Sequence, residues 1–368
     1  MIKYFRLIFL LMYLIPAVAF SENEPLRIKI TDGVIEPVPL AIPKFLSEII
    51  AVKEISKNIS LLIAEDLIKT GLFRIIPDDA HISSVTNFKA AVSYADWKAI
   101  NAQGLISGAV TISKLKKQLC FDPRGCLVVK FKLFDIYAEN NFFEDGQKIY
   151  ASEPSDWRRL AHKIADDIYY YLTGELGYFN TKVTFISESG LKNNRLKRLA
   201  IMDYDGANVE FLTDQSDIVL TPSFSPDGSQ IVYTSFKLGE PHVFLMDLKT
   251  RGSFILDERN QMSFSPQFSP DGESVVMSVV NNANTDLYSL DLKSGIRRRL
   301  TSGPAIETSA SFSPDGSQIV YESDRSGTQQ LYILPLGAGE GRRISFGGGS
   351  YGTPVWSPGG DLIAFTKK

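Results

Sequence analysis

The chain has 368 residues, of which 44% are hydrophobic and 22% are charged, a balance that excludes a disordered or collagen-like protein. This length is too great for one ordinary hydrophobic core, so two domains are expected. The formal net charge of −3 argues against a phosphate-binding surface, and therefore against nucleic acid as a partner.

Residues 1–19 predict a secretory signal peptide. Lys3 and Arg6 form a basic start, residues 7–15 a short apolar run, and Ala17-Val18-Ala19 supplies the small residues of a cleavage site. The uncharged run of residues 7–21 is shorter than the roughly 20 residues that a spanning helix needs, so export is preferred to a membrane anchor. Cleavage would lower the net charge of the mature chain to −5.

Candidate metal-ligating residues are few. Cys120 and Cys126 flank a turn-like segment, and in an exported protein this spacing favours a local disulfide over a metal or redox pair. Zinc needs four ligands, whereas the three histidines are scattered at positions 81, 162 and 242. His162 and Asp166, four residues apart, are interpreted as a solvated pair on a helix face rather than a catalytic or metal pair.

Residues 20–178 predict an α/β domain. Apolar side chains at helical spacing indicate one helix from about Ile55 to Gly71 and a second from Trp157 to Gly174, each ended by its glycine. Strands are expected at residues 73–76, 105–110 and 127–137. Two helices packed against a small sheet follow from this pattern.

From residue 179 onward one phrase returns every 44 residues. It begins as Phe224-Ser225-Pro226-Asp227-Gly228, and its serine recurs at positions 269, 313 and 357. Proline and Asp-Gly form a tight turn between two strands, so each repeat holds four short strands. Four strands in 40 to 45 residues is the signature of a β-propeller blade, with a solenoid as the structural alternative. Residues 179–368 are therefore expected to form a propeller.

The two ends of the repeat array are incomplete. The first copy has strands only at residues 182–187, 199–204 and 209–212, and the chain ends after two strands of a fifth copy. About four and a half blades are thus present where six are expected, which leaves roughly 70 residues missing. We expect a C-terminally truncated chain with an open ring and an exposed strand edge.

Several segments resemble the TolB family of the Tol-Pal envelope system in order and spacing. They are the signal peptide, Arg27–Gly33 with the prolines that follow it, Asp66–Phe73 and Leu172–Phe179. The repeated phrase alone is shared with the propellers of prolyl-oligopeptidase-type enzymes. Departures from the family pattern are a longer Cys120–Cys126 loop, Gly359 in place of Asp, Pro335 in place of the third-strand Asp, and the missing last blades.

The resemblance implies a non-enzymatic adaptor in the periplasm that supports outer-membrane integrity and envelope constriction at cell division. Its mature N-terminal segment would bind TolA, an inner-membrane protein, by adding an extended peptide to a sheet edge. The residues concerned are Ser21, Glu22, Pro25, Arg27, Lys29 and Asp32. Its propeller would bind the lipoprotein Pal through Met262, Ser265 and Thr308. Other outer-membrane proteins are further candidate partners, and the protein is not expected to span a membrane.

An enzyme is the less favoured interpretation. Gly348-Gly349-Ser350-Tyr351-Gly352 matches a G-x-S-x-G nucleophile motif, but that motif needs a following helix and a later histidine, and no histidine follows His242. The alternatives to an adaptor are a ligand-binding propeller and the regulatory propeller half of a truncated prolyl-oligopeptidase-type peptidase. No cofactor is expected, apart from calcium in the propeller channel by family analogy, for which the sequence selects no ligands.

Overall fold

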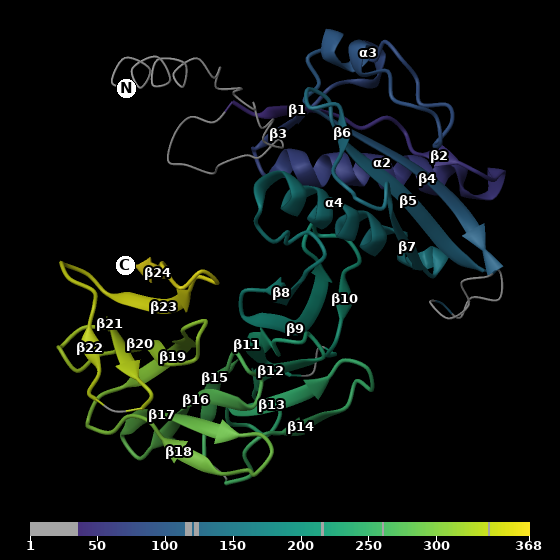
Figure 1. Cartoon of the computed structure of the whole chain (residues 1–368). Helices are drawn as coiled ribbons and strands as arrows, with labels where there is room; N and C mark the ends of the chain where they lie inside the picture. Colours follow the sequence, from purple (N-terminus) through teal and green to yellow (C-terminus); the bar gives the residue numbers. More distant parts are fainter. Residues whose placement is uncertain (1–35, 115–119, 121–124, 215–216, 260, 338) are drawn as a thin grey trace, which may run out of the picture. The chain divides into compact units, whose positions relative to one another are not determined.

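The structure is a computed structural model, and it describes residues 36–114, 120, 125–214, 217–259, 261–337 and 339–368. The chain divides into two compact units, Met1–Asn180 and Thr181–Lys368 (Figure 1). The division lies two residues after the boundary expected at 178/179. The predicted signal peptide and the predicted TolA-binding segment lie outside the described residues.

A mixed sheet forms the centre of the first unit. Its strand order is β3-β1-β4-β5-β6, with β2 paired to β4 and β7 to β5. The strands are β1 Val38–Ala41, β2 Leu46–Ser47, β3 Phe73–Ile75, β4 Gly104–Ser113, β5 Cys126–Asp135, β6 Asn140–Asn141 and β7 Lys148–Ser152. β1 runs parallel to β3 and β4, whereas β4 and β5 form a long antiparallel pair. The three predicted strands of this domain are confirmed.

Two long helices, α2 (Lys53–Lys69) and α4 (Trp157–Thr173), pack against each other, and both predictions are confirmed. Gly174 ends α4 in the left-handed conformation, with φ of 80°, and its N–H donates to the carbonyl of Tyr170 at 2.8 Å. A short helix, α3 (Tyr94–Ala99), places Trp97 on the sheet face of Leu105 and Phe134. Single-turn 3₁₀ helices lie at Ile50–Val52, Asp78–Ala80 and Pro154–Asp156.

The interpretation of His162 and Asp166 as a solvated pair is wrong. His162 is buried against α2, where its Nδ1 lies 2.7 Å from Oδ2 of the fully buried Asp66. Asp166 instead accepts the backbone N–H groups of Phe179 and Asn180, at 2.8 and 3.1 Å. Burial raises the pKa of Asp166 above its ordinary value, and these two hydrogen bonds oppose the rise. Helical spacing placed both residues on one face of α4, but only packing determined that α2 covers His162.

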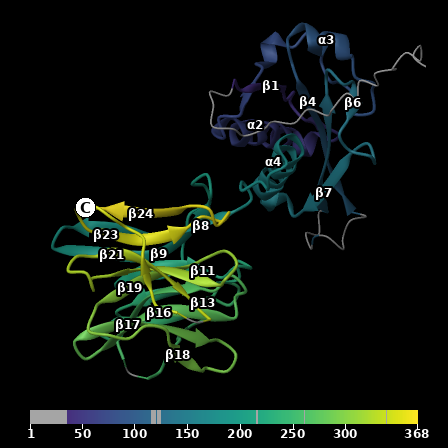
Figure 2. The ribbon, with the colours of Figure 1, turned by 60° about the vertical axis from the view of Figure 1, so that its left-hand side comes forward.

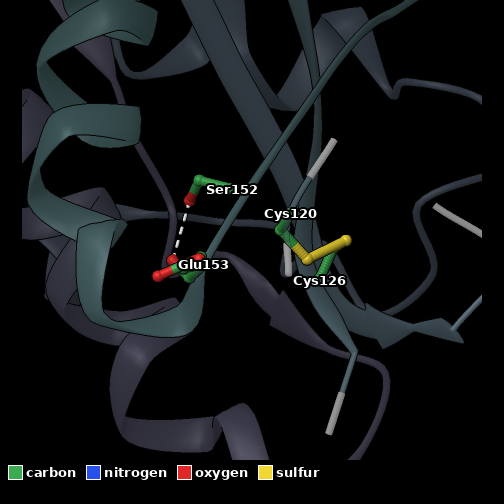
Figure 3. The surroundings of a disulfide bond; sticks show 4 residues. All are labelled: Cys120, Cys126, Ser152 and Glu153. Atoms are coloured by element: carbon green, nitrogen blue, oxygen red, sulfur yellow. Dashed lines mark hydrogen bonds between the residues drawn. A yellow bond between two sulfur atoms is a disulfide. The ribbon is translucent and has the colours of Figure 1, made fainter. Parts of the chain in front are cut away.

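Cys120 and Cys126 form a disulfide with a Cα–Cα distance of 5.7 Å (Figure 3). Both cysteines are buried, and Cys126 opens β5 opposite Ser113, the last residue of β4. The bond therefore closes the connection between the two longest strands of the sheet. Ser152, at the end of the neighbouring β7, donates its hydroxyl hydrogen to the carbonyl of Glu153 at 2.9 Å.

The second unit consists of antiparallel sheets that follow one another in chain order, and this confirms the β-propeller class. The first sheet has β8 Lys182–Leu191, β9 Asn194–Asp203 and β10 Glu210–Phe211. The second has β11 Val219–Phe224, β12 Gln230–Ser235, β13 His242–Asp247 and β14 Ser253–Ile255. The third has β15 Ser263–Phe268, β16 Ser274–Asn281, β17 Asn284–Asp291 and β18 Arg297–Arg299. The fourth has β19 Glu307–Phe312, β20 Gln318–Ser323, β21 Gln330–Pro335 and β22 Arg342–Arg343, and the fifth has β23 Tyr351–Trp356 and β24 Ile363–Lys367.

Each blade begins with its innermost strand. β11, β15, β19 and β23 contact one another in sequence, whereas the later strands of each blade lie progressively further out (Figures 1 and 2). The first sheet has three strands and lacks this opening strand, as its sequence predicted. The predicted strand positions in the repeats are confirmed to within a few residues.

The repeated phrase forms a tight hydrogen-bonded turn. The hydroxyl of Ser225 donates to Asp227 at 2.6 Å and accepts the N–H of Gln230 at 2.9 Å. Such bonds to the ionised carboxylate lower the pKa of Asp227 to about 2. In the last copy, where Gly359 replaces the aspartate, the hydroxyl of Ser357 donates to Asp361 instead, at 2.9 Å.

We expect Asp227 and Asp315 to titrate at a pKa of about 2, since a serine hydroxyl supports each carboxylate. A depressed folded-state pKa contributes stability above the unfolded value near 4, and this contribution is lost as the pH falls toward 2. Ser225→Ala should therefore raise the pKa of Asp227 alone. Carboxyl NMR titration measures this shift, with Asp315 in the same chain as the unchanged control. Equal pKa values for Asp227 before and after the substitution would contradict the assignment.

Candidate partner-binding face of the propeller

Antiparallel strands give the propeller two unlike ends. The Ser-Pro-Asp-Gly turns and the turns between third and fourth strands lie at one end, here called the turn face. The turns between second and third strands, together with the connections between blades, lie at the other end, here called the connection face. In the described residues the connection face is formed by 213–214, 217–218, 236–241, 257–259, 261–262, 282–283, 301–306, 324–329 and 345–350.

An apolar side chain recurs on the connection face directly before the innermost strands. Ile218, Met262 and Ile306 are 44 residues apart, and each backbone carbonyl accepts an N–H from the end of the adjacent second strand. The donors are Phe236 at 3.0 Å, Val280 at 2.9 Å and Asp324 at 3.4 Å. The backbone is thus held by the blade, while 48% of Ile218 and 46% of Ile306 remain exposed and Met262 is half-buried.

Two further apolar side chains extend this surface. Leu238, in the turn after β12, is 61% exposed, and Phe346, in the connection before β23, is 73% exposed. We call Ile218, Leu238, Met262, Ile306 and Phe346 the apolar ring. Sequence reasoning selected only Met262 from this set, although the 44-residue step from Met262 leads directly to Ile218 and Ile306.

A hydroxyl group supports the connection face in most blades. The hydroxyl oxygens of Thr213, Thr301 and Ser345 each accept a backbone N–H from a third strand. The donors are Leu199 at 3.0 Å, Leu287 at 2.9 Å and Leu331 at 2.9 Å. Asp257 occupies the equivalent position in the second sheet, 44 residues after Thr213. There the N–H of Val243 is accepted by the hydroxyl of Ser263 instead, at 3.1 Å. Because Ser263 accepts this N–H, the Asp257 carboxylate is available for other partners.

Asp257 anchors the connection that carries Met262. Its carboxylate lies 2.7 Å from Nη1 of Arg297, in the next blade, and 3.0 Å from Nη1 of Arg259. Nη2 of Arg297 also donates to the side-chain oxygen of Gln261 at 2.6 Å. One guanidinium from the neighbouring blade therefore holds both ends of the segment before Met262.

Two other buried carboxylates near this face form ion pairs. Asp286 lies 2.7 Å from Nη2 of Arg299, and Glu307 pairs with Arg325. Arg325 also lies 4.6 Å from the centroid of the Tyr332 ring. These buried charges therefore have partners within the propeller.

The other two predicted Pal-binding residues lie further along the innermost strands. Ser265 sits in a β-bulge of β15 with φ of 51°, and its N–H donates to Oγ1 of Thr234 in the preceding blade at 3.1 Å. Thr308 is buried in β19, and its hydroxyl donates to the carboxylate of Glu322 at 2.7 Å. Of the three residues, Met262 is thus the one in the apolar ring.

The G-x-S-x-G match begins an innermost strand. Ser350 lies 44 residues after Ile306, and its carbonyl accepts the N–H of Lys368 at 2.9 Å. β23 follows immediately, and residues 351–368 contain no helix. This geometry differs from the strand-turn-helix that a nucleophile elbow requires.

The fold and this face define the class: a β-propeller protein with an α/β N-terminal domain. The model of the TolB amino-terminal domain matches residues 26–142, and the model of the TolB β-propeller domain matches residues 169–368. The chain therefore belongs to the TolB family, as its sequence indicated.

Relatives named Tol-Pal system protein TolB support this assignment. The protein from Cereibacter sphaeroides is 54% identical over 244 residues, which are 65% of this chain and 52% of that protein. The protein from Dinoroseobacter shibae is 54% identical over 235 residues, which are 64% of this chain and 50% of that protein. The chain spans about half the length of these curated relatives.

A solved structure shares the fold. The crystal structure of TolB from Acinetobacter baumannii superposes with a TM-score of 0.75 and 24% identity, over 90% of this chain and 77% of that chain. Within the described part of this chain, neither 17-residue helix has the length and apolar character of a bilayer-spanning segment.

Proposed function

We propose that this protein is a periplasmic adaptor of the Tol-Pal system that binds Pal through the connection face and TolA through residues 21–32. Through these contacts it would support outer-membrane integrity and envelope constriction during cell division. The observation that carries the proposal is the apolar ring, in which Ile218, Met262 and Ile306 recur with the repeat on a backbone held by the blades. Exposed apolar side chains that recur at one end of a protein are a common feature of protein-binding surfaces.

The ring has the arrangement of a protein interface. Ile306 has an exposed side chain, and beside it Arg325 and Glu307 form an ion pair. An apolar centre surrounded by paired polar groups is the usual anatomy of an interface that must also remain soluble when free. Membership of the TolB family favours this function over the ligand-binding and peptidase alternatives, and no catalytic role is proposed.

We expect Ile306→Asp to weaken the binding of the cognate Pal periplasmic domain by about 10- to 30-fold, because a carboxylate at the centre of an interface must be desolvated. Leu362→Asp is the matched control, since Leu362 is 67% exposed in the turn between β23 and β24, on the turn face. Calorimetric titration with purified Pal measures both affinities. Equal losses from the two variants, or a loss from Leu362→Asp alone, would place Pal elsewhere.

The TolA contact is tested separately. Deleting residues 21–32 should abolish capture of TolA and leave the affinity for Pal within about twofold, because the two contacts use different parts of the chain. Co-purification from detergent-solubilised envelopes measures both partners at once. Undiminished TolA capture by the shortened chain would reject this assignment, and recovery of the full chain in the cytoplasmic fraction would reject the periplasmic location.

A further inference from the structure

A cavity of about 180 Å³ lies in the N-terminal domain, on the sheet face opposite α4. Its floor is formed by neighbouring positions of β4 and β5, where Ser107 lies opposite Lys132 and Leu105 opposite Phe134. Residues 83–88, residues 90–93 and Trp97 of α3 line the rest of it. An apolar cavity of about 150 Å³ is large enough for benzene, so this one accommodates a ligand of slightly larger size.

The cavity is apolar on several sides and carries one charge. Phe88, Trp97 and Phe134 supply aromatic surface, and all three are largely buried. Among the described residues that line the cavity, Lys132 is the single charged side chain, and no carboxylate is present. Its Nζ donates to the backbone carbonyl of Phe88 at 3.0 Å and lies 4.8 Å from the centroid of the Phe88 ring.

The neighbouring Lys130 also lies near the Phe88 ring, with its Nζ 5.7 Å from the centroid, but it has a different charge partner. Lys130 lies two residues earlier on the same face of β5, but its Nζ is paired with Oε1 of Glu48 at 2.5 Å, and it does not line the cavity. The positive charge of Lys130 is therefore neutralised within the domain. The charge of Lys132 is held by a carbonyl and a ring, which leaves its ammonium group suited to an anion.

Ser83 and Ser107 are two of the five hydroxyl side chains that line the cavity, and the others belong to Ser84, Thr86 and Ser93. The Oγ atom of Ser83 is buried and has no hydrogen-bond partner among the described residues. Ser107, directly opposite Lys132 on β4, is also buried. Buried hydroxyl groups normally have partners, and a carboxylate beside Lys132 offers acceptor oxygens to both.

We propose that this cavity binds a small organic acid, with its carboxylate at Lys132 and the two serines and its apolar body against Phe88, Trp97 and Phe134. The charge of the lysine and the size of the cavity limit the ligand to a short aromatic or aliphatic monocarboxylate. This site is separate from the connection face and does not depend on the proposed function.

Benzoate is the probe, titrated into the full chain by calorimetry and, in a Trp157→Phe/Trp356→Phe background, followed by the fluorescence of Trp97. We expect saturable 1:1 binding, and at least tenfold weaker binding of benzyl alcohol, which has similar size but no charge. Lys132→Met keeps the aliphatic stem and should weaken benzoate at least tenfold, whereas Lys130→Met should change it by less than twofold.

Each outcome decides the proposal. Absence of saturable benzoate binding, or equal affinity for benzoate and benzyl alcohol in the unaltered chain, would overturn it without any variant. If Lys132→Met and Lys130→Met weaken benzoate binding equally, in chains with unchanged circular dichroism, then benzoate is held by general electrostatic attraction and not at a specific site.

Discussion

Replacing Phe131 with alanine is expected to lower the free energy of unfolding of the N-terminal domain by about 3–5 kcal/mol. Phe131 is fully buried in β5, on the face opposite Lys132. Its ring stacks on Tyr150 of β7 at a centroid distance of 6.2 Å and meets the edge of Phe143 at 5.2 Å. Alanine removes these contacts and leaves a cavity that the rigid central strand cannot close.

Urea unfolding in a Trp356→Phe background measures this change, because the two remaining tryptophans, Trp97 and Trp157, belong to the N-terminal domain. Tyr137→Ala is the control, since Tyr137 is exposed just after β5 and its loss should cost no more than about 0.5 kcal/mol. Similar losses from the two variants would show that the buried ring contacts of Phe131 do not stabilise the domain.

Tyr321→Ala is expected to destabilise the propeller by a comparable amount, about 3–5 kcal/mol, as for other large buried aromatic residues. Tyr321 is fully buried in β20, in an apolar cluster that also contains Val276 and Leu287 from the preceding blade. It therefore joins two blades. Its hydroxyl accepts a hydrogen bond from Arg325 at 2.8 Å and occupies the space where a Cβ on residue 341 would lie, which is why glycine is required there.

Differential scanning calorimetry of the full chain measures the loss as a lower melting temperature of the propeller transition. Tyr321→Phe is the graded control, because it removes only the hydrogen bond and should cost about 0.5–1.5 kcal/mol. A Phe variant as unstable as the Ala variant would show that the hydroxyl, and not the ring, carries the stabilisation.

The stability of the unaltered chain and that of Tyr321→Phe should also respond differently to pH. Burial, aided by the nearby Glu307, raises the pKa of Tyr321 to about 12. A raised folded-state pKa contributes stability that is complete below the unfolded value near 10 and is lost as the pH rises toward 12. Tyr321→Phe should therefore show less alkaline destabilisation between pH 10 and 12 than the unaltered chain.

The connection face was only partly predictable. The family pattern selects both Met262 and Thr308; Met262 lies on the connection face, whereas Thr308 is buried and bonded to Glu322. The alternation of side chains along a strand indicates which residues share a face of that strand. Whether each of these side chains is exposed depends on how the neighbouring blade covers it. Ile306, two residues before Thr308, lies on that face with an exposed side chain.

By itself the sequence determined the repeat, its strands and its turns, because Pro, Asp-Gly and alternating side chains act over a few residues and keep their 44-residue period. It also determined where α4 ends, since Gly174 adopts a left-handed conformation that other residues avoid. Only the tertiary structure decided that Asp66 pairs with His162, that Arg297 holds Asp257, and that Lys132 lines a cavity while Lys130 does not. These partners are distant in the chain, and packing, not local preference, brings them together.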